Sequence, residues 1–471
     1  MTTHSKKTPA FDVEAAAAEG ISVHGGLIAL DALAREFGLW EKIRALRCLD
    51  PRKDTSHGYG PEVLVAQIVL SFCCGGAGLS DAEKLLRDRD PVLNEVLGIQ
   101  RGAAASSLGE WLRAQTPESV DALQGLTREF IAWVLQRADA RRVRRDGVLE
   151  IFFDDTQLEL YGKHFEGAAL NYNGDTTLSW QTLWVGPFLA GGVFGDGSRD
   201  VSEDLPALLA DTRPLWLDAA RTGTAHFYAD SGSSAGGYLM KIDAETWGWS
   251  VSYNKWTEIP ERLARELPAA RWTPPRESIG RKGQAILEQF AWVRHMPGEE
   301  CSHPVDFAVV RWHDQDGLPL HHYAFVAGRA GKTAGAHDPE SARALFARHH
   351  LKGAREQGFS ELLSDLDLHH PPCQSLVANR MWYALGMLAF DLMTAFQILH
   401  LPDDAQAMRT RSLIRYLVTV PVKLVRHAHR LKAILLVPLN WLRWWKQFVR
   451  ELFPKRPRGR PPKHRSAPPD G

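Results

Sequence analysis

Apolar residues recur at helical spacing through the first part of the chain. Leu27, Leu30 and Leu33 fall on one face of a helix, and similar stripes continue to about residue 134. The pattern predicts a mostly α-helical module over residues 21–140. Residues 1–20 show no such pattern, and we expect them to be disordered.

Downstream, strand-like and helical patterns alternate, which is typical of an α/β fold. They predict the first part of an α/β core over residues 147–254. Strands are expected at 148–153, 157–161, 179–187, 226–230 and 248–253, with helices at 202–219 and 236–244.

The pattern changes after residue 254. Short strand-like runs separated by turns predict a β-rich insertion over residues 255–335. Helical spacing returns, and residues 336–400 are expected to complete the core. The segment 379–400 is apolar on most faces, which predicts a buried helix.

The last part of the chain is strongly basic. From Arg409 to Arg465 there are 16 Lys or Arg and one acid, although the net charge of the whole chain is zero. Residues 401–450 are expected to form a basic helical region, and residues 451–471 a disordered basic tail. This asymmetry predicts a polyanionic partner for the C-terminal part. A solvated tail is the alternative.

Composition excludes several classes of protein. Hydrophobic content of 44% and charged content of 24% are ordinary for a folded protein. Five scattered cysteines without a CxxC spacing indicate neither a disulfide framework nor a zinc site. The longest apolar stretch, residues 433–445, is too short to span a bilayer, and no apolar signal segment follows the polar N-terminus. We therefore expect a cytoplasmic protein without a membrane partner.

Three acidic residues are candidates for a metal site. Asp154 and Asp230 each follow a strand-like apolar run, and Glu356 lies in a later helix-like stretch. Carboxylate oxygens are preferred ligands of Mg²⁺, and two such ions can clamp a phosphoryl transfer. Asp155 points to the opposite face of the strand from Asp154, and periodicity does not choose between them. The alternative is that both strand-end residues only cap turns.

Glu356 has basic neighbours at helical spacing. In a continuous helix, His349, Lys352 and Glu356 lie on one stripe, which would place Lys352 near a DNA phosphate. An ordinary Lys–Glu pair is the alternative. Glu361 is the second choice for the third acidic ligand.

Two further features concern DNA. Arg458-Gly459-Arg460-Pro461, with Lys463 nearby, resembles an AT-hook, whose slim extended backbone fits a narrow A·T minor groove. A plain basic tail is the alternative. Three tryptophans in the basic region, Trp441, Trp444 and Trp445, could face DNA or a membrane surface, or belong to a core.

The order of these motifs resembles the DDE transposases of bacterial insertion sequences, DDE group 1, and in particular the insertion sequence 1380 family. The matching segments are Asp154-Asp155-Thr156 with a following Tyr161-Gly162, Phe227-Tyr228-Ala229-Asp230-Ser231-Gly232, His349-x2-Lys352-x3-Glu356, and Val377-Ala378-Asn379-Arg380. The resemblance implies an α/β fold with a ribonuclease-H-like catalytic core, a β-rich insertion, and helical regions at both ends.

The resemblance also implies a function and its residues. Asp154, Asp230 and Glu356 would hold two Mg²⁺ ions, with Mn²⁺ as a substitute. The enzyme would cut the terminal inverted repeats and join the 3′-OH to target DNA, working as a homodimer near the nucleoid. Lys352, His349 and Trp256 would contact DNA. His349 and Leu363 depart from the usual Tyr and Lys, so a decayed DNA-binding relic, or a two-metal nuclease without strand transfer, stays open.

Overall fold

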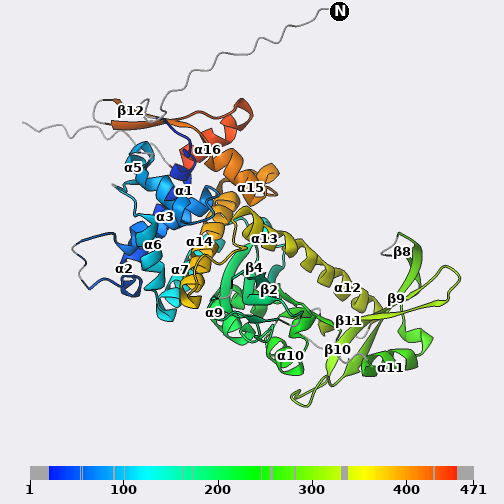
Figure 1. The fold of residues 1–471 in the computed structure, drawn as a ribbon. Coiled ribbons are helices and arrows are strands. Elements are labelled where there is room, and N and C mark those ends of the chain that lie inside the picture. Colours follow the sequence, from blue (N-terminus) through cyan, green and yellow to red (C-terminus); the bar gives the residue numbers. More distant parts are fainter. Residues whose placement is uncertain are drawn as a thin grey trace, which may run out of the picture.

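In the computed structural model, residues 21–452 are described, except 54, 56, 89–90, 100, 163, 172, 246, 255–257, 281–282, 330–337 and 428–429. Helices from both ends of the sequence gather on one side of the molecule, and a large sheet occupies the other (Figure 1). The segment 276–329 reaches away from the helices as an arm of long strands.

The helical side begins with seven helices. They are α1 (Leu27–Phe37), α2 (Leu39–Ala45), α3 (Pro61–Cys73), α4 (Leu79–Glu83), α5 (Pro91–Leu97), α6 (Ala105–Arg113) and α7 (Pro117–Leu135), followed by the short α8 (Ala140–Val143). Local sequence explains several ends. Gly38 takes the left-handed conformation that stops α1. Thr116 and Ser119 form a reciprocal capping box at the start of α7. The expected helical pattern is confirmed here.

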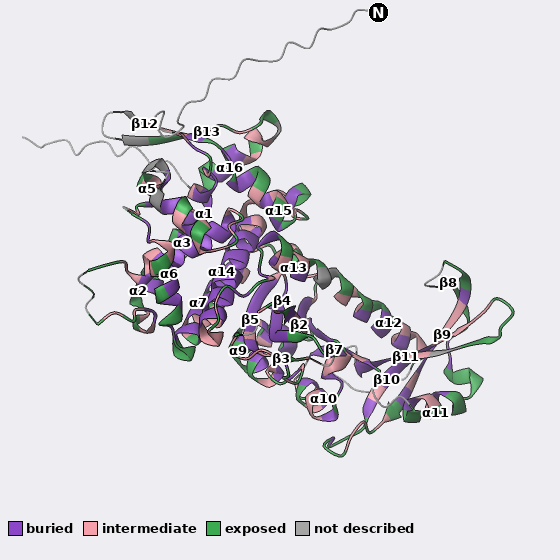
Figure 2. Ribbon diagram, in the orientation of Figure 1, coloured by how far each residue is buried: buried purple, intermediate pink, exposed green. Residues whose placement is uncertain are grey.

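Helix α14 (Leu376–His400) connects the helical side to the sheet. Its residues are buried on almost every side (Figure 2). Trp382 packs on Phe72 of α3, and Tyr383 packs on Trp180 in the sheet. Among the described helices α14 is long and apolar enough to cross a membrane by composition, but 89% of that stretch is buried inside the protein. The predicted buried helix is confirmed.

In the described part of the chain, the sheet has ten strands. They are β2 (Leu149–Glu159), β3 (Ala169–Leu170), β4 (Thr176–Val185), β5 (Phe188–Asp196), β6 (Ala225–Ala229), β7 (Gly248–Tyr253), β8 (Arg276–Ile279), β9 (Ala285–His295), β10 (Val305–His313) and β11 (Pro319–Arg329). The central order is β5-β4-β2-β6-β7, with β2, β6 and β7 parallel and the β4 pairings antiparallel. This mixed α/β sheet is consistent with a ribonuclease-H-like domain.

Helices cover the sheet from several sides. Helix α9 (Leu205–Thr222) packs on β2, β4, β5 and β6, and α12 (Pro339–His349) packs on β7 and the strands of the arm. Helix α10 (Gly236–Asp243) follows β6. The expected strand before Asp230 and the helix after it are confirmed. Helix α9 begins at Leu205 rather than at Ser202, whose hydroxyl bonds to Ser233 instead of capping the helix.

The two strands expected at 148–153 and 157–161 are one strand, β2. Asp154 and Asp155 therefore lie inside a strand and not at its end. The strand continues because β4 supplies polar partners: the hydroxyl of Thr182 donates to the Asp154 carbonyl, and that of Ser179 donates to Asp155. The carboxylate of Asp155 is tolerated in the sheet because Ser179 hydrogen-bonds to it.

The β-rich insertion is not a separate sheet. Strand β11 pairs antiparallel with β7, so β8–β11 extend the central sheet and cover its edge. The insertion also contains a helix, α11 (Glu258–Glu266), which the sequence pattern did not predict.

The basic C-terminal region was expected to be helical, and this is wrong in part. Strands β12 (Val422–His427) and β13 (Arg430–Leu435) form a hairpin that pairs with β1 (Ile21–Ser22). Alternating apolar and basic residues give this segment a strand period. Helices α15 (Thr410–Leu413) and α16 (Leu442–Leu452) flank the hairpin. Trp445 is buried, and Trp441 and Trp444 pack on the core, so the core interpretation of these tryptophans is confirmed.

Asn379 provides a test of how α14 is tied to the chain before it. Its buried amide donates to the Cys373 carbonyl at 2.7 Å and accepts from the Cys373 N–H at 3.0 Å. We expect Asn379→Ala to lower the free energy of unfolding by about 2–4 kcal/mol, because two backbone groups lose their partner. Urea denaturation measures this. The exposed-site variant Asn173→Ala should change it by less than about 0.5 kcal/mol, and an equal effect of both would contradict this role.

Candidate active site

Parallel pairing of β2 and β6 brings two acidic residues to the same level. Phe152 lies opposite Tyr228 in the register, and their rings stack with centroids 4.6 Å apart. Asp154 and Asp230 each follow two residues later. Because side chains in a strand alternate between faces, both carboxyl groups continue the face of these rings. The register therefore places the two acids side by side.

One lysine lies between the two carboxylates. The ammonium of Lys352 is 2.5 Å from Oδ2 of Asp230 and 3.9 Å from Oδ2 of Asp154. Burial raises the pKa of Asp154 to about 6; Lys352 opposes this shift, and the negative charge of Asp230 adds to it. The structure thus brings together three of the residues singled out in the sequence; the expected contact of Lys352 with a DNA phosphate stays a prediction.

Asp155 has a different environment. Its two carboxylate oxygens accept hydrogen bonds from Ser179 at 2.5 Å and from the Gln157 amide at 2.7 Å. Burial raises its pKa, and these hydrogen bonds partly oppose the shift. Asp154, and not Asp155, lies near the Lys352 ammonium together with Asp230, which favours Asp154 of the two candidates that periodicity left open.

The carboxylates border a cleft of about 840 Å³. Its lining includes Asp154, Asp155, Asp230, Arg199, Asp200 and Ser233. Its lining comes from the middle of β2, the turn after β6 and the loop between β5 and α9, with further residues from the end of β3 and from the position after β7. A cleft at strand ends in an α/β sheet is a common place for a ligand.

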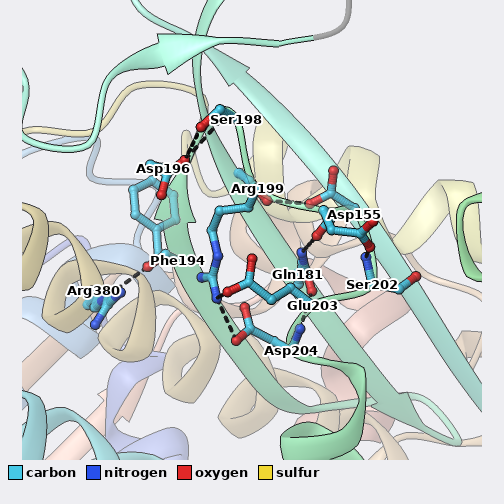
Figure 3. A network of polar contacts seen from close by, with 12 residues as sticks. Asp155, Gln181, Phe194, Asp196, Ser198, Arg199, Ser202, Glu203, Asp204 and Arg380 are labelled. Carbon is cyan, nitrogen blue, oxygen red and sulfur yellow. Dashed lines mark hydrogen bonds and ion pairs between the residues drawn. The ribbon is translucent and has the colours of Figure 1, made fainter. Parts of the chain in front are cut away.

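The loop between β5 and α9 forms a wall held by a polar network (Figure 3). Arg199 reaches Asp204 at 2.7 Å and Glu203 at 3.3 Å. The buried amide of Gln181 donates to the Asp200 carbonyl at 2.6 Å and accepts from the Asp204 N–H at 2.9 Å. Sequence reasoning missed this wall. The polar run Asp196-Gly197-Ser198-Arg199-Asp200 after an apolar stretch was the available signal.

A hydroxyl pair connects this wall to the Asp230 loop. Ser202 and Ser233 are both buried, and their Oγ atoms are 2.7 Å apart. Ser233 belongs to the short turn that directly follows Asp230. This hydroxyl pair therefore connects the turn after Asp230 to the cleft wall.

His349 is buried at the end of α12. Its Nδ1 lies 3.0 Å from the Ser250 hydroxyl and its Nε2 lies 2.8 Å from the Ser252 hydroxyl, both on β7. Burial, together with the positive charge of Lys352, lowers the pKa of His349 to about 4. Because both ring nitrogens have serine partners, His349 acts here as an anchor for α12 and not as an exposed DNA contact.

His349, Lys352 and Glu356 do not lie on one face of a single helix. Helix α12 ends at His349, a 3-10 segment spans His350–Arg355, and α13 (Glu356–Ser360) begins only afterwards, so one continuous helix is wrong. Gly353 in the connection weakens helical structure. The backbone of Glu356 starts α13, but its side chain lies outside the described residues.

Other predicted residues have separate outcomes. Glu361, the second choice for the third ligand, accepts hydrogen bonds from the N–H and hydroxyl of Thr410 at 2.9 and 2.8 Å, so it is tied to α15. Trp256, Arg458, Arg460 and Lys463 lie outside the described residues.

The described side chains partly fit a divalent cation. Asp154 and Asp230 offer hard oxygen ligands, and the ammonium between them stands where positive charge is needed. Within the part of the chain whose side chains are described, no three His, Cys, Asp or Glu residues gather as a metal cluster. The carboxylate of Glu356 does not belong to that part.

Comparison with known families identifies one match. Residues 11–177, about a third of the chain, match a family model described as transposase DDE domain group 1. The matched part contains Asp154 and ends before Asp230. No curated protein matches the chain. The family match supports a DDE transposase, an enzyme acting on DNA; the assignment to the insertion sequence 1380 family stays a prediction.

The anchor role of His349 predicts a pH dependence. The unfolded chain takes up this proton below about pH 6.5, whereas the folded chain does so only near pH 4. The contribution of neutral His349 to the free energy of unfolding is therefore fully present above about pH 6.5 and is lost as the pH falls from about 6.5 towards 4. As the pH falls from about 7.5 to about 5, the free energy of unfolding of the wild type should decrease. The decrease should be about 2 kcal/mol smaller in His349→Gln, which lacks the imidazole.

Urea denaturation at the two pH values measures this difference. Parallel pH dependences in the wild type and His349→Gln would show that the ring gains a proton equally well in both states, and would contradict a buried neutral anchor.

Proposed function

We propose that this protein is a DNA transposase that cuts the ends of an insertion sequence and joins the freed 3′-OH to target DNA. The observation that carries the proposal is the convergence of Asp154 and Asp230 around one cation, on neighbouring parallel strands. The match to the transposase DDE domain supports the reaction class. Assignment to the insertion sequence 1380 family is part of the proposal.

In this proposal Asp154, Asp230 and Glu356 hold two Mg²⁺ ions, for which Mn²⁺ substitutes. Such ions, when bound, lower the pKa of a bound water or hydroxyl and neutralise charge that develops on the phosphate. The two aspartates supply oxygen ligands from a rigid sheet, and the network around Arg199 keeps the opposite wall in place. The chain needs no covalent intermediate, so no nucleophilic side chain is required.

DNA contacts are proposed on the basic helical side. On α16, Trp445 and Phe448 are buried, whereas Arg443, Lys446 and Arg450 are exposed. This outward basic face can follow a phosphate backbone. The helical N-terminal module would add contacts to the terminal inverted repeats. We propose a homodimer, because two element ends must be paired, in the cytoplasm near the nucleoid. Trp256 remains a candidate for stacking on a flipped base.

Substitutions of the aspartates test the proposal. We expect Asp230→Asn and Asp154→Asn to reduce Mg²⁺-dependent cleavage of end DNA by roughly 10²–10³-fold or more, because each removes a cation ligand. DNA binding should persist, and gel-shift and cleavage assays with the same duplex separate the two effects.

Asp155→Asn is the matched control. Its carboxyl group hydrogen-bonds to Ser179 and Gln157, so we expect a smaller loss of cleavage than with Asp154→Asn. Full cleavage by Asp230→Asn would remove this residue from the site. A 3′-OH joining assay distinguishes a transposase from a nuclease of the same fold.

The tail is tested separately. Replacing Arg458 and Arg460 by Ala should weaken binding to A·T-rich duplexes more than to G·C-rich duplexes, because an AT-hook reads the narrow minor groove. Fluorescence anisotropy at fixed salt measures both affinities. Equal losses on the two duplexes would support a plain basic tail.

A further inference from the structure

We propose that Lys352 serves as an internal counter-cation, which holds Asp154 and Asp230 together in the cation-free protein and must leave before a divalent cation binds between them. This inference rests on the proposed function, because it concerns the same carboxylates. It adds a competition between a side chain and a metal ion that shapes how the site is loaded.

The first argument is the position of the ammonium. Lys352 Nζ lies 2.5 Å from Asp230 and 3.9 Å from Asp154, and its side chain is only 15% exposed. A divalent cation taken up by these two aspartates would need the carboxylate charge that the ammonium now neutralises. Lys352 would therefore compete with such an ion for Asp154 and Asp230.

The second argument is that Lys352 is held by the same sheet as the carboxylates. Three residues earlier, His349 bonds to Ser250 and Ser252 on β7. Strand β7 is the parallel neighbour of β6, which leads directly into Asp230. The chain just before Lys352 is therefore fixed to β7 through His349. Packing as well as charge places the ammonium of Lys352 near the two carboxylates.

The third argument concerns the charge balance of the cleft. Of the described residues that line it, Arg199 is the one with a positive charge. Its guanidinium is already paired with Asp204 and Glu203. Lys352 is therefore the cation that neutralises the Asp154–Asp230 pair when no metal ion is bound. Without it, two neighbouring carboxylates would repel each other in a partly buried place.

The consequence is an exchange of cations. A lysine carries its compact charge on a flexible stem, so the ammonium can swing away without movement of the backbone. Once released, it adds a positive charge at the edge of the cleft, where the phosphate of a bound DNA end would lie. Lys352 would then take part in two steps, the binding of the divalent cation and the binding of the DNA phosphate.

Mn²⁺ binding to the full-length chain tests this exchange. We expect Lys352→Met to bind Mn²⁺ roughly tenfold or more tightly than the wild type, because a competing positive charge is removed. Lys352→Arg, which keeps the charge, should not gain affinity. Lys241→Met removes an exposed lysine of α10 and should leave the affinity unchanged. Isothermal titration calorimetry measures all four proteins.

Thermal unfolding gives a second measurement. Without metal, Lys352→Met should unfold at a lower temperature than the wild type, because the carboxylates lose their counter-cation. Added Mn²⁺ should raise its unfolding temperature more than that of the wild type. If Lys352→Met does not fold, Lys352→Gln has the same loss of charge with a polar side chain and takes its place.

The outcomes are distinguishable. Equal or weaker Mn²⁺ affinity in folded Lys352→Met and Lys352→Gln would overturn the counter-cation role and leave the proposed function standing. Absence of Mn²⁺ binding in the wild type and in every variant would overturn the metal-dependent function as well. Tighter binding in Lys352→Met that Asp230→Asn abolishes in the double variant would support both.

Discussion

The parallel pairing of β2 with β6 is the constraint on which the candidate site depends. It sets Phe152 against Tyr228, and through strand periodicity it sets Asp154 beside Asp230. Two carboxyl groups at this spacing, one of them buried enough to raise its pKa, require a positive charge nearby. The position of Lys352 answers that requirement. The acidic site is thus a direct consequence of strand register.

The surroundings of the acids are more rigid than a surface loop would be. Gln181 holds the loop between β5 and α9 from inside the sheet, and Ser202 joins that loop to Ser233, next to the Asp230 turn. On the other side, His349 holds the end of α12 against β7. Groups that are fixed by packed neighbours lose little freedom when a ligand binds, which favours a preorganised site.

Part of this arrangement was predictable from the sequence. The apolar runs before Asp154 and Asp230 identified two strands, and the apolar pattern after Asn379 identified α14, because burial leaves a direct periodic signal. The contact of Lys352 with the aspartates was not predictable, since it joins residues more than a hundred positions apart in the sequence. The C-terminal hairpin was missed because the segment was interpreted as helical and its pairing with the distant β1 leaves no local signal. The pairing of β11 with β7 is likewise long-range.

The net charge of the chain is zero, but its acidic and basic residues are concentrated in different parts of the sequence. The cleft is bordered by aspartates, and a polyanion would be repelled from it unless cations are present. The energy for DNA binding must therefore come from elsewhere, and the exposed basic residues of α16 lie on the helical side. Helix α14 connects the two: it packs on α3 and α7, and Arg380 donates to the Phe194 carbonyl in β5. A buried helix that contacts both parts fixes the position of the helical side relative to the two acids.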